Sequence, residues 1–147
     1  MRKTFTTRSA KATEKMAAKF AGKLKRGRVI ALNGPMGAGK TVFVKGLAKG
    51  LDFKEVIQSP TYVMMNVYPL DHKKLKTLVH VDCYRLNEAE EIKHVGLEDY
   101  WNDKEALVVI EWADKIKDLL PKKITRIDFK ILDEYKRKIS IRRRALL

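Results

Sequence analysis

The chain has 147 residues, and its 32 Lys and Arg outnumber 18 Asp and Glu to give a formal net charge of +14. No apolar run approaches the ~18 residues needed to span a bilayer, and Cys83, the single cysteine, excludes a disulfide within the chain. Its apolar neighbours predict a small buried thiol. We expect one domain over residues 1–147, a cytoplasmic location and no membrane partner.

The first predicted element is a helix at about residues 9–25, where apolar side chains recur every three or four positions. The apolar run at residues 29–32 predicts a buried strand, and a second helical pattern covers about residues 40–51.

The segment between this strand and this helix, Gly34-Pro-Met-Gly-Ala-Gly-Lys-Thr41, matches the pattern G-x-x-x-x-G-K-[ST]. Glycines let successive backbone N–H groups turn toward phosphate oxygens, and the helix adds its positive N-terminal end. The pattern assigns Lys40 to the β- and γ-phosphates and the Thr41 hydroxyl to Mg²⁺. We therefore expect ATP or GTP with Mg²⁺, bound by Met36, Gly37, Ala38, Gly39, Lys40 and Thr41.

Extended segments follow the second helix. Residues 56–57 and 62–68, separated by Ser59-Pro-Thr61, predict a β-rich insertion. Residues 78–82 then alternate in polarity and end on the carboxylate of Asp82.

The second half of the chain continues the alternation of helices and strands. Helical turns are expected up to residue 100, and the continuous apolar run 107–111, typical of a buried parallel strand, ends on Glu111. A helix is expected at about 112–119, and segments 124–132 and 138–142 predict a β-pair. This order predicts an α/β, three-layer P-loop NTPase-like domain with a central mixed, mostly parallel sheet.

Asp82 and Glu111 each end a predicted strand. In open α/β sheets, ligands lie beyond the carboxyl ends of the strands. If both strands flank the loop strand, one carboxylate would hold Mg²⁺ or its waters and the other would orient an attacking water. The residues do not decide which acid has which role, and a solvated charge is the alternative for each.

The histidines, His72, His80 and His94, show no spacing with cysteine or carboxylate that predicts a zinc site, and we expect them at the surface or within strands. Two roles are open for Trp112, which follows Glu111 directly: it lines the nucleotide pocket or packs at a strand-to-helix junction. Burial preference favours packing.

Positive charge is densest in the predicted C-terminal strand and tail at about residues 136–147. The pattern predicts a basic edge strand, with RNA or an acidic protein as a candidate partner. Solubility is the alternative explanation, because aromatic residues are not interleaved with these charges in the sequence.

Together these motifs resemble the TsaE family, small bacterial P-loop ATPases of threonylcarbamoyladenosine tRNA modification. The resemblance covers about residues 9–121 and adds to the phosphate loop the segments Ser59-Pro-Thr-Tyr62, His80-Val-Asp-Cys-Tyr-Arg-Leu86, Val95-Gly-Leu-Glu-Asp-Tyr100, Ile110-Glu-Trp112 and Leu120-Pro121.

The resemblance implies an ATPase that is weak alone and couples ATP turnover to a complex of TsaB and TsaD, which transfers threonylcarbamoyl to adenosine in tRNA. It implies catalytic roles for Lys40, Asp82 and Glu111, with Thr41 and both acids near Mg²⁺. It also implies three further residues beside the nucleotide: Thr13, Trp112 and Thr61, the last in a switch-like segment.

Two features depart from the family pattern. Pro35 occupies a loop position that is usually acidic in the family, and we expect phosphate binding to survive because this position supplies shape rather than a ligand. The basic tail leaves two routes to tRNA, an indirect one through the partners and a direct one through the tail.

Two other functions compete with the ATPase. A small-molecule or nucleoside kinase would carry a similar loop, but the chain shows no Arg-rich lid segment. A nucleotide-gated RNA-binding protein would use the basic tail, with hydrolysis incidental.

Overall fold

The computed structural model describes residues 2–59 and 64–143. The strands are β1 (Arg2–Thr7), β2 (Arg28–Asn33), β3 (Met65–Pro69), β4 (Thr77–Asp82), β5 (Ala106–Glu111), β6 (Thr125–Ile131) and β7 (Arg137–Arg143). The helices are α1 (Ala10–Gly22) and α2 (Lys40–Gly50), with 3₁₀ segments η1 (Ala89–Val95), η2 (Leu97–Tyr100) and η3 (Ala113–Leu119). Within these described ranges, no helix combines the length and apolar character needed to cross a membrane.

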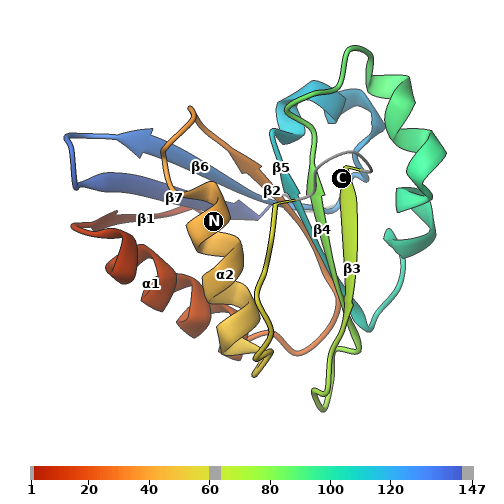
Figure 1. Ribbon diagram of the computed structural model, residues 1–147, viewed down its shortest axis with the longest axis horizontal. Helices are drawn as coiled ribbons and strands as arrows, with labels where there is room; N and C mark the ends of the chain where they lie inside the picture. Colours follow the sequence, from red (N-terminus) through yellow and green to blue (C-terminus); the bar gives the residue numbers. More distant parts are fainter. Residues whose placement is uncertain (1, 60–63, 144–147) are drawn as a thin grey trace.

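The strands form one sheet in the order β1-β7-β6-β2-β5-β4-β3 (Figure 1). The four central strands, β6, β2, β5 and β4, run parallel, whereas β7 and β3 pair antiparallel with their inner neighbours. The mixed, mostly parallel sheet is therefore confirmed. Of the predicted β-rich insertion, residues 65–68 lie in β3, which forms a hairpin with β4. Residues 56–57, expected to be extended, lie in no strand, and residues 62–63 lie outside the described residues.

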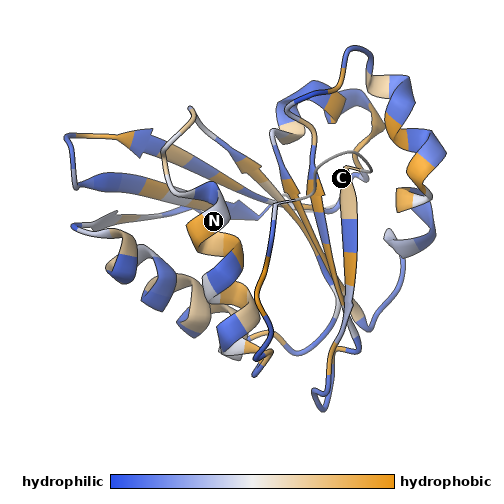
Figure 2. Cartoon of the chain, in the orientation of Figure 1, coloured by the Kyte–Doolittle hydropathy of each residue, from blue (hydrophilic) through white to orange (hydrophobic). Residues whose placement is uncertain are grey.

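The two faces of the sheet are covered by different elements, which gives the predicted three layers. Along β2, Ile30 and Leu32 belong to the core shared with α1 and α2, while Val29 and Ala31 belong to the core shared with the 3₁₀ segments. This is the alternation expected of a strand buried on both faces. Figure 2 shows the result as largely hydrophobic central strands and hydrophilic loops at the sheet ends.

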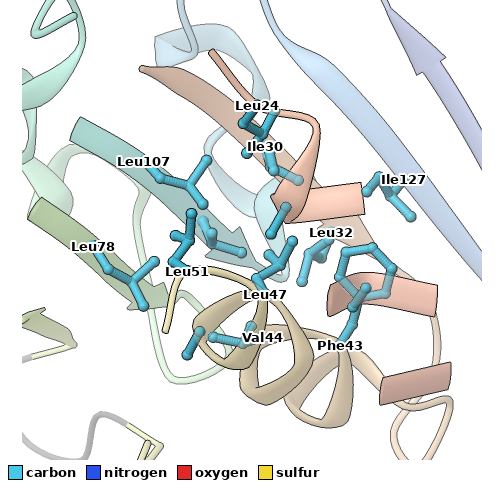
Figure 3. Close-up of a cluster of buried hydrophobic side chains, with 14 of the residues drawn as sticks. Leu24, Ile30, Leu32, Phe43, Val44, Leu47, Leu51, Leu78, Leu107 and Ile127 are labelled. Carbon is cyan, nitrogen blue, oxygen red and sulfur yellow. The ribbon is translucent and has the colours of Figure 1, made fainter. Parts of the chain in front are cut away.

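Helix α2 is fixed in place by its apolar face. Phe43, Leu47 and Leu51 are buried against sheet residues that include Leu32 and Leu107 (Figure 3). Each such side chain contributes about 1.5–3 kcal/mol when removed from water. Because α2 begins immediately after the phosphate loop, this packing also fixes the end of the loop.

Helix α1 packs beside α2 on the same face of the sheet, through small residues (Figure 1). Ala17 and Ala21 are fully buried, and a Cβ atom added to Gly46 of α2 would overlap the carbonyl oxygen of Glu14. Ser9 caps α1 by accepting a hydrogen bond from the Ala12 backbone N–H at 3.0 Å. The predicted helix at 9–25 is confirmed, with its last turn ending earlier, at Gly22.

Three details of the predicted order need correction. Strand β1 was not predicted, because all but the last of its side chains are exposed and give no apolar alternation. The C-terminal strand β7 is not an edge strand, since β1 pairs along its outer side. The helix expected at 112–119 is a 3₁₀ segment with a kink at Ile116.

Candidate nucleotide site

The phosphate loop joins β2 to the start of α2. Gly39, the residue before the helix, has a φ of 101°, a left-handed conformation that favours glycine. At the other end of the loop, a Cβ atom on Gly34 would lie 2.8 Å from the carbonyl oxygen of Phe129 in β6. Glycine at both ends lets the chain turn tightly, and the first backbone N–H groups of α2 lack helical partners and suit an anion.

The Lys40 side chain is buried and folds back over its own loop. Its Nζ donates hydrogen bonds to the carbonyl oxygens of Gly34 at 2.5 Å and Pro35 at 2.9 Å, and lies 4.0 Å from the centroid of the Trp112 ring. Burial lowers the pKa of the Lys40 ammonium, while Glu111 and Asp82 act in the opposite direction. A triphosphate would provide this desolvated cation with a stronger anionic partner.

Glu111 accepts two side-chain hydrogen bonds at the end of β5. The Thr41 hydroxyl donates to Oε1 at 2.9 Å, and Nε2 of His80 lies 2.5 Å from Oε2. Glu111 is 2% exposed, and His80 in β4 is fully buried. Within the described residues His80 Nδ1 has no hydrogen-bond partner, which favours the tautomer whose Nε2–H donates to the carboxylate. His80 therefore fixes the direction of Glu111.

Asp82 is the register partner of Glu111 on the neighbouring strand. The two acids do meet at the carboxyl edge of the sheet, but β4 does not flank the loop strand as the sequence suggested, because β5 lies between β4 and β2. Oδ1 of Asp82 accepts the Tyr84 backbone N–H at 2.9 Å. Burial raises the pKa of the Asp82 carboxyl, and the negative charge of Glu111 adds to this shift.

These groups surround a cavity of about 320 Å³ at the carboxyl ends of β2, β4 and β5. It is lined by Met36, Gly37, Gly39, Lys40, Thr41, Val42, Asp82, Tyr84, Glu111 and Trp112. Most of the residues predicted for nucleotide and metal binding are thus brought together.

Trp112 takes both of the roles considered for it. It lines the cavity, with its ring centroid 5.0 Å from that of Tyr84, and it is half-buried against the second hydrophobic core. Its φ of 57° is uncommon for a bulky residue, and such strain is concentrated at functional sites.

Two of the predicted residues that the structure describes, Thr13 and Ala38, do not line the cavity. Thr13 is buried beside the loop, and its methyl group would lie 3.7 Å from a Cβ atom added to Gly39. The Thr13 hydroxyl is hydrogen-bonded to the Thr7 hydroxyl at 2.7 Å. Ala38 is buried within the loop. Thr61 lies outside the described residues.

Besides Val42, which lines the cavity, three residues of the site that hydrogen-bond or carry an aromatic ring were not predicted from sequence as site residues. They are His80, Tyr84 and Arg137. Arg137, at the start of β7, donates from Nη2 to the Gly37 carbonyl oxygen at 3.1 Å and so supports the tip of the loop. An available signal for His80 was its place in an apolar strand, two residues before the terminal acid.

The donors of the site suit Mg²⁺. Thr41, Glu111 and Asp82 offer hydroxyl and carboxylate oxygens, the ligands that this cation prefers. Among residues 2–59 and 64–143, no three His, Cys, Asp or Glu side chains gather as a metal cage.

Comparison with known proteins identifies relatives along nearly the whole chain. Residues 7–139 match the family model of threonylcarbamoyl adenosine biosynthesis protein TsaE. The chain is similar to the tRNA threonylcarbamoyladenosine biosynthesis proteins TsaE of Rickettsia typhi, with 36% identity over 97% of this chain and 96% of the relative, and of Treponema pallidum, with 36% identity over 92% and 96%. The TsaE protein of Bacillus subtilis is 33% identical over 94% of this chain and 82% of its own.

The fold is also found in a solved structure. The crystal structure of Bacillus subtilis YdiB superposes with a TM-score of 0.80 at 27% sequence identity, covering 99% of this chain and 87% of the other.

Proposed function

The chain belongs to the TsaE family, which takes part in tRNA threonylcarbamoyladenosine biosynthesis, and we propose that it serves there as a Mg²⁺-dependent ATPase. Residues 1–147 would act as one P-loop ATPase domain, in the cytoplasm where tRNA is modified. The observation that carries the proposal is the cavity in which Lys40, Thr41, Asp82 and Glu111 meet at the end of the phosphate loop.

ATP would bind through its phosphates at the loop. The free N–H groups at the start of α2 would donate hydrogen bonds to the phosphate oxygens, and Lys40 would exchange its two carbonyl partners for the β- and γ-phosphates. Trp112, which already lies under the Lys40 ammonium, would close this side of the pocket and exclude water.

The two acids would have different roles, because their surroundings differ. Thr41 and Glu111 would hold Mg²⁺, which supplies neutralising charge to the phosphate oxygens when bound. Glu111 is almost wholly buried, and both its oxygens are engaged by neighbouring side chains. Asp82 is more exposed and faces the same cavity, so we assign it the task of orienting the attacking water.

TsaB and TsaD would be the partners that ATP turnover serves. The support for this step is membership of the TsaE family, whose relatives are named for tRNA threonylcarbamoyladenosine biosynthesis. Hydrolysis in the isolated chain is expected to be slow, with the partner complex raising it. Transfer of the threonylcarbamoyl group would belong to the partners.

The test is ATP hydrolysis with Mg²⁺, measured for the chain alone and with TsaB, TsaD and tRNA. We expect phosphate release that the partner complex stimulates and that chelation of Mg²⁺ abolishes. Phosphorylation of an added small-molecule or nucleoside acceptor would instead indicate a kinase.

A further inference from the structure

A second cavity lies at the end of the sheet opposite the phosphate loop. It has a volume of about 590 Å³ and is lined by the starts of β2 and β6 and by the segment before β5. Because β2 has six residues, this cavity is about 20 Å from the phosphate loop. It is therefore separate from the nucleotide site.

Its lining is strongly basic. Among the described residues, Asp103 is the one acidic side chain that lines it, and the Oδ1 atom of Asp103 already accepts the Glu105 backbone N–H at 2.8 Å. None of the ion pairs within the described part of the chain involves its cations. These cations are Arg26, Arg28, Lys104, Lys122, Lys123 and Arg143.

Arg28 is the most informative of these residues. Its Nη1 atom is buried, and no acceptor in residues 2–59 or 64–143 lies within hydrogen-bond reach of it. Burial and the nearby Arg143 charge lower the pKa of the Arg28 guanidinium. Burying the Nη1 donor without a partner costs free energy, and an anion held by the exposed part of the half-buried guanidinium would offset part of that cost.

A third hollow continues the same basic surface. It lies between β1 and α1, has a volume of about 410 Å³, and includes Lys3, Lys19 and Lys23 in its lining. Arg143 lines both hollows, so they adjoin one another. We call the combined surface of the two hollows the basic edge.

Each hollow of the basic edge also contains an aromatic side chain. Trp101 lines the larger hollow and is half-buried, while Phe5 lines the smaller one and is 39% exposed. Neither stands among the C-terminal charges in the sequence, and the fold places each in the lining of a hollow that Arg143 also lines. The interleaving of cations and aromatic rings that the sequence lacks is therefore present in the structure.

We propose that the basic edge binds an RNA chain, with phosphates at the cations and an unstacked base on Trp101. Guanidinium groups match phosphate oxygens in two-point contacts, and aromatic rings stack on bases of any sequence. Cations spread over two adjoining hollows suit an anion that repeats along a chain. An acidic peptide would satisfy the charges but would leave the aromatic rings without a specific role.

This proposal also revises the expected basic tail. Arg137 lies at the phosphate loop, at one end of β7, whereas Arg143 lies at the basic edge, at the other end. The positive cluster read from the sequence is thus divided between two sites, and Arg144 lies outside the described residues.

The experiment measures binding of the full chain to a labelled single-stranded oligoribonucleotide of mixed sequence, without ATP, over a range of salt concentrations. Because no ATP is present, the result does not depend on whether the proposed ATPase activity is correct. We compare K122A/K123A with K45A/K54A, in which two lysines beside a different cavity are removed for the same change in net charge.

We expect the affinity for RNA to fall as the salt concentration rises. K122A/K123A should make the slope of log affinity against log salt shallower by about 1.4, which is about 0.7 for each lost phosphate contact. The control pair should leave that slope unchanged. In a W112F background Trp101 is the sole tryptophan, and RNA should quench its fluorescence. Equal losses from both pairs, or absence of RNA binding, would overturn the proposal, as would binding of poly-glutamate in place of RNA.

Arg28→Met distinguishes a role of Arg28 in RNA binding from a role in stabilising the fold, because Tm and RNA affinity are measured together. Replacing this half-buried guanidinium, whose buried Nη1 has no partner among the described residues, with an apolar side chain should maintain or raise Tm while weakening RNA binding. A lower Tm with unchanged RNA affinity would show that Arg28 serves the fold.

Discussion

The Thr41 hydroxyl donates a 2.9 Å hydrogen bond to Oε1 of Glu111, joining the start of α2 to the end of β5. The contact connects residues 70 positions apart and places the proposed magnesium ligands side by side. On its other oxygen, Glu111 meets the imidazole of His80. The metal side of the site is therefore positioned before any ligand arrives.

Glu111→Gln should lose Mg²⁺-dependent nucleotide affinity and turnover together. The amide retains much of the shape of the side chain but removes the charge that the cation needs. ATP binding measured with and without Mg²⁺ checks this assignment: the variant should lose the gain in affinity that Mg²⁺ provides. Retained Mg²⁺-dependent affinity with lost turnover would transfer the water-orienting role to Glu111.

Asp82→Asn should separate binding from chemistry in the opposite way. If Asp82 orients the attacking water, kcat should fall by about 10²–10⁴, the usual contribution of a positioned acid or base. The affinity for ATP with Mg²⁺ should remain close to that of the unmodified chain. A parallel loss of affinity would place Asp82 on the metal.

Asp82→Asn should also stabilise the protein. Burial raises the pKa of this carboxyl above its ordinary 3.8, so the folded state binds the proton more tightly than the unfolded state. The stability that protonation of Asp82 provides is fully present below pH 3.8, the ordinary pKa, and is lost as the pH rises through the higher pKa of the folded state. At neutral pH the variant should gain a few degrees in Tm, and the gain should shrink on acidification through that interval.

The asparagine retains an oxygen that can accept the Tyr84 N–H, so the turn after β4 should survive. Thermal unfolding of both chains between neutral and acidic pH provides the comparison. A Tm difference that does not vary with pH would attribute the change to packing rather than to charge.

His80→Leu should destabilise the fold by about 1–3 kcal/mol or more, because Oε2 of the buried Glu111 carboxylate would lose its partner. Turnover should fall as well, since the carboxylate would no longer be fixed in direction. His80→Gln retains a donor and should recover part of both losses. Chemical denaturation measures the loss of stability. If His80→Leu and His80→Gln were equally stable, loss of the hydrogen bond to Glu111 would be excluded as the cause of the destabilisation.

The parts of the site that a local motif encodes were predictable. The loop glycines, Lys40 and Thr41 follow from one short pattern, and the strand-end positions of Asp82 and Glu111 follow from where apolar runs stop. Their shared edge required only the rule that parallel strands end together.

Features that depend on long-range pairing were not predictable in the same way. His80 contacts Glu111 because β4 and β5 pair in one particular register. That register cannot be predicted from the sequence of either strand alone. Strand β7 was expected at the edge because nothing in the exposed, polar sequence of β1 indicated a strand to cover it. Likewise, Phe5 and Trp101 reach the same basic edge only after the sheet has formed.

The measurement closest to the central claim is titration calorimetry of ATP with Mg²⁺ into the unmodified chain, K40A and K45A. Lys45 is an exposed lysine on the same helix and controls for charge. We predict saturable heat for the unmodified chain and K45A and its loss in K40A, because the buried Lys40 ammonium is the cation within the loop. Absence of heat with the unmodified chain at millimolar ATP, or undiminished binding by K40A, would contradict the assignment of a nucleotide site.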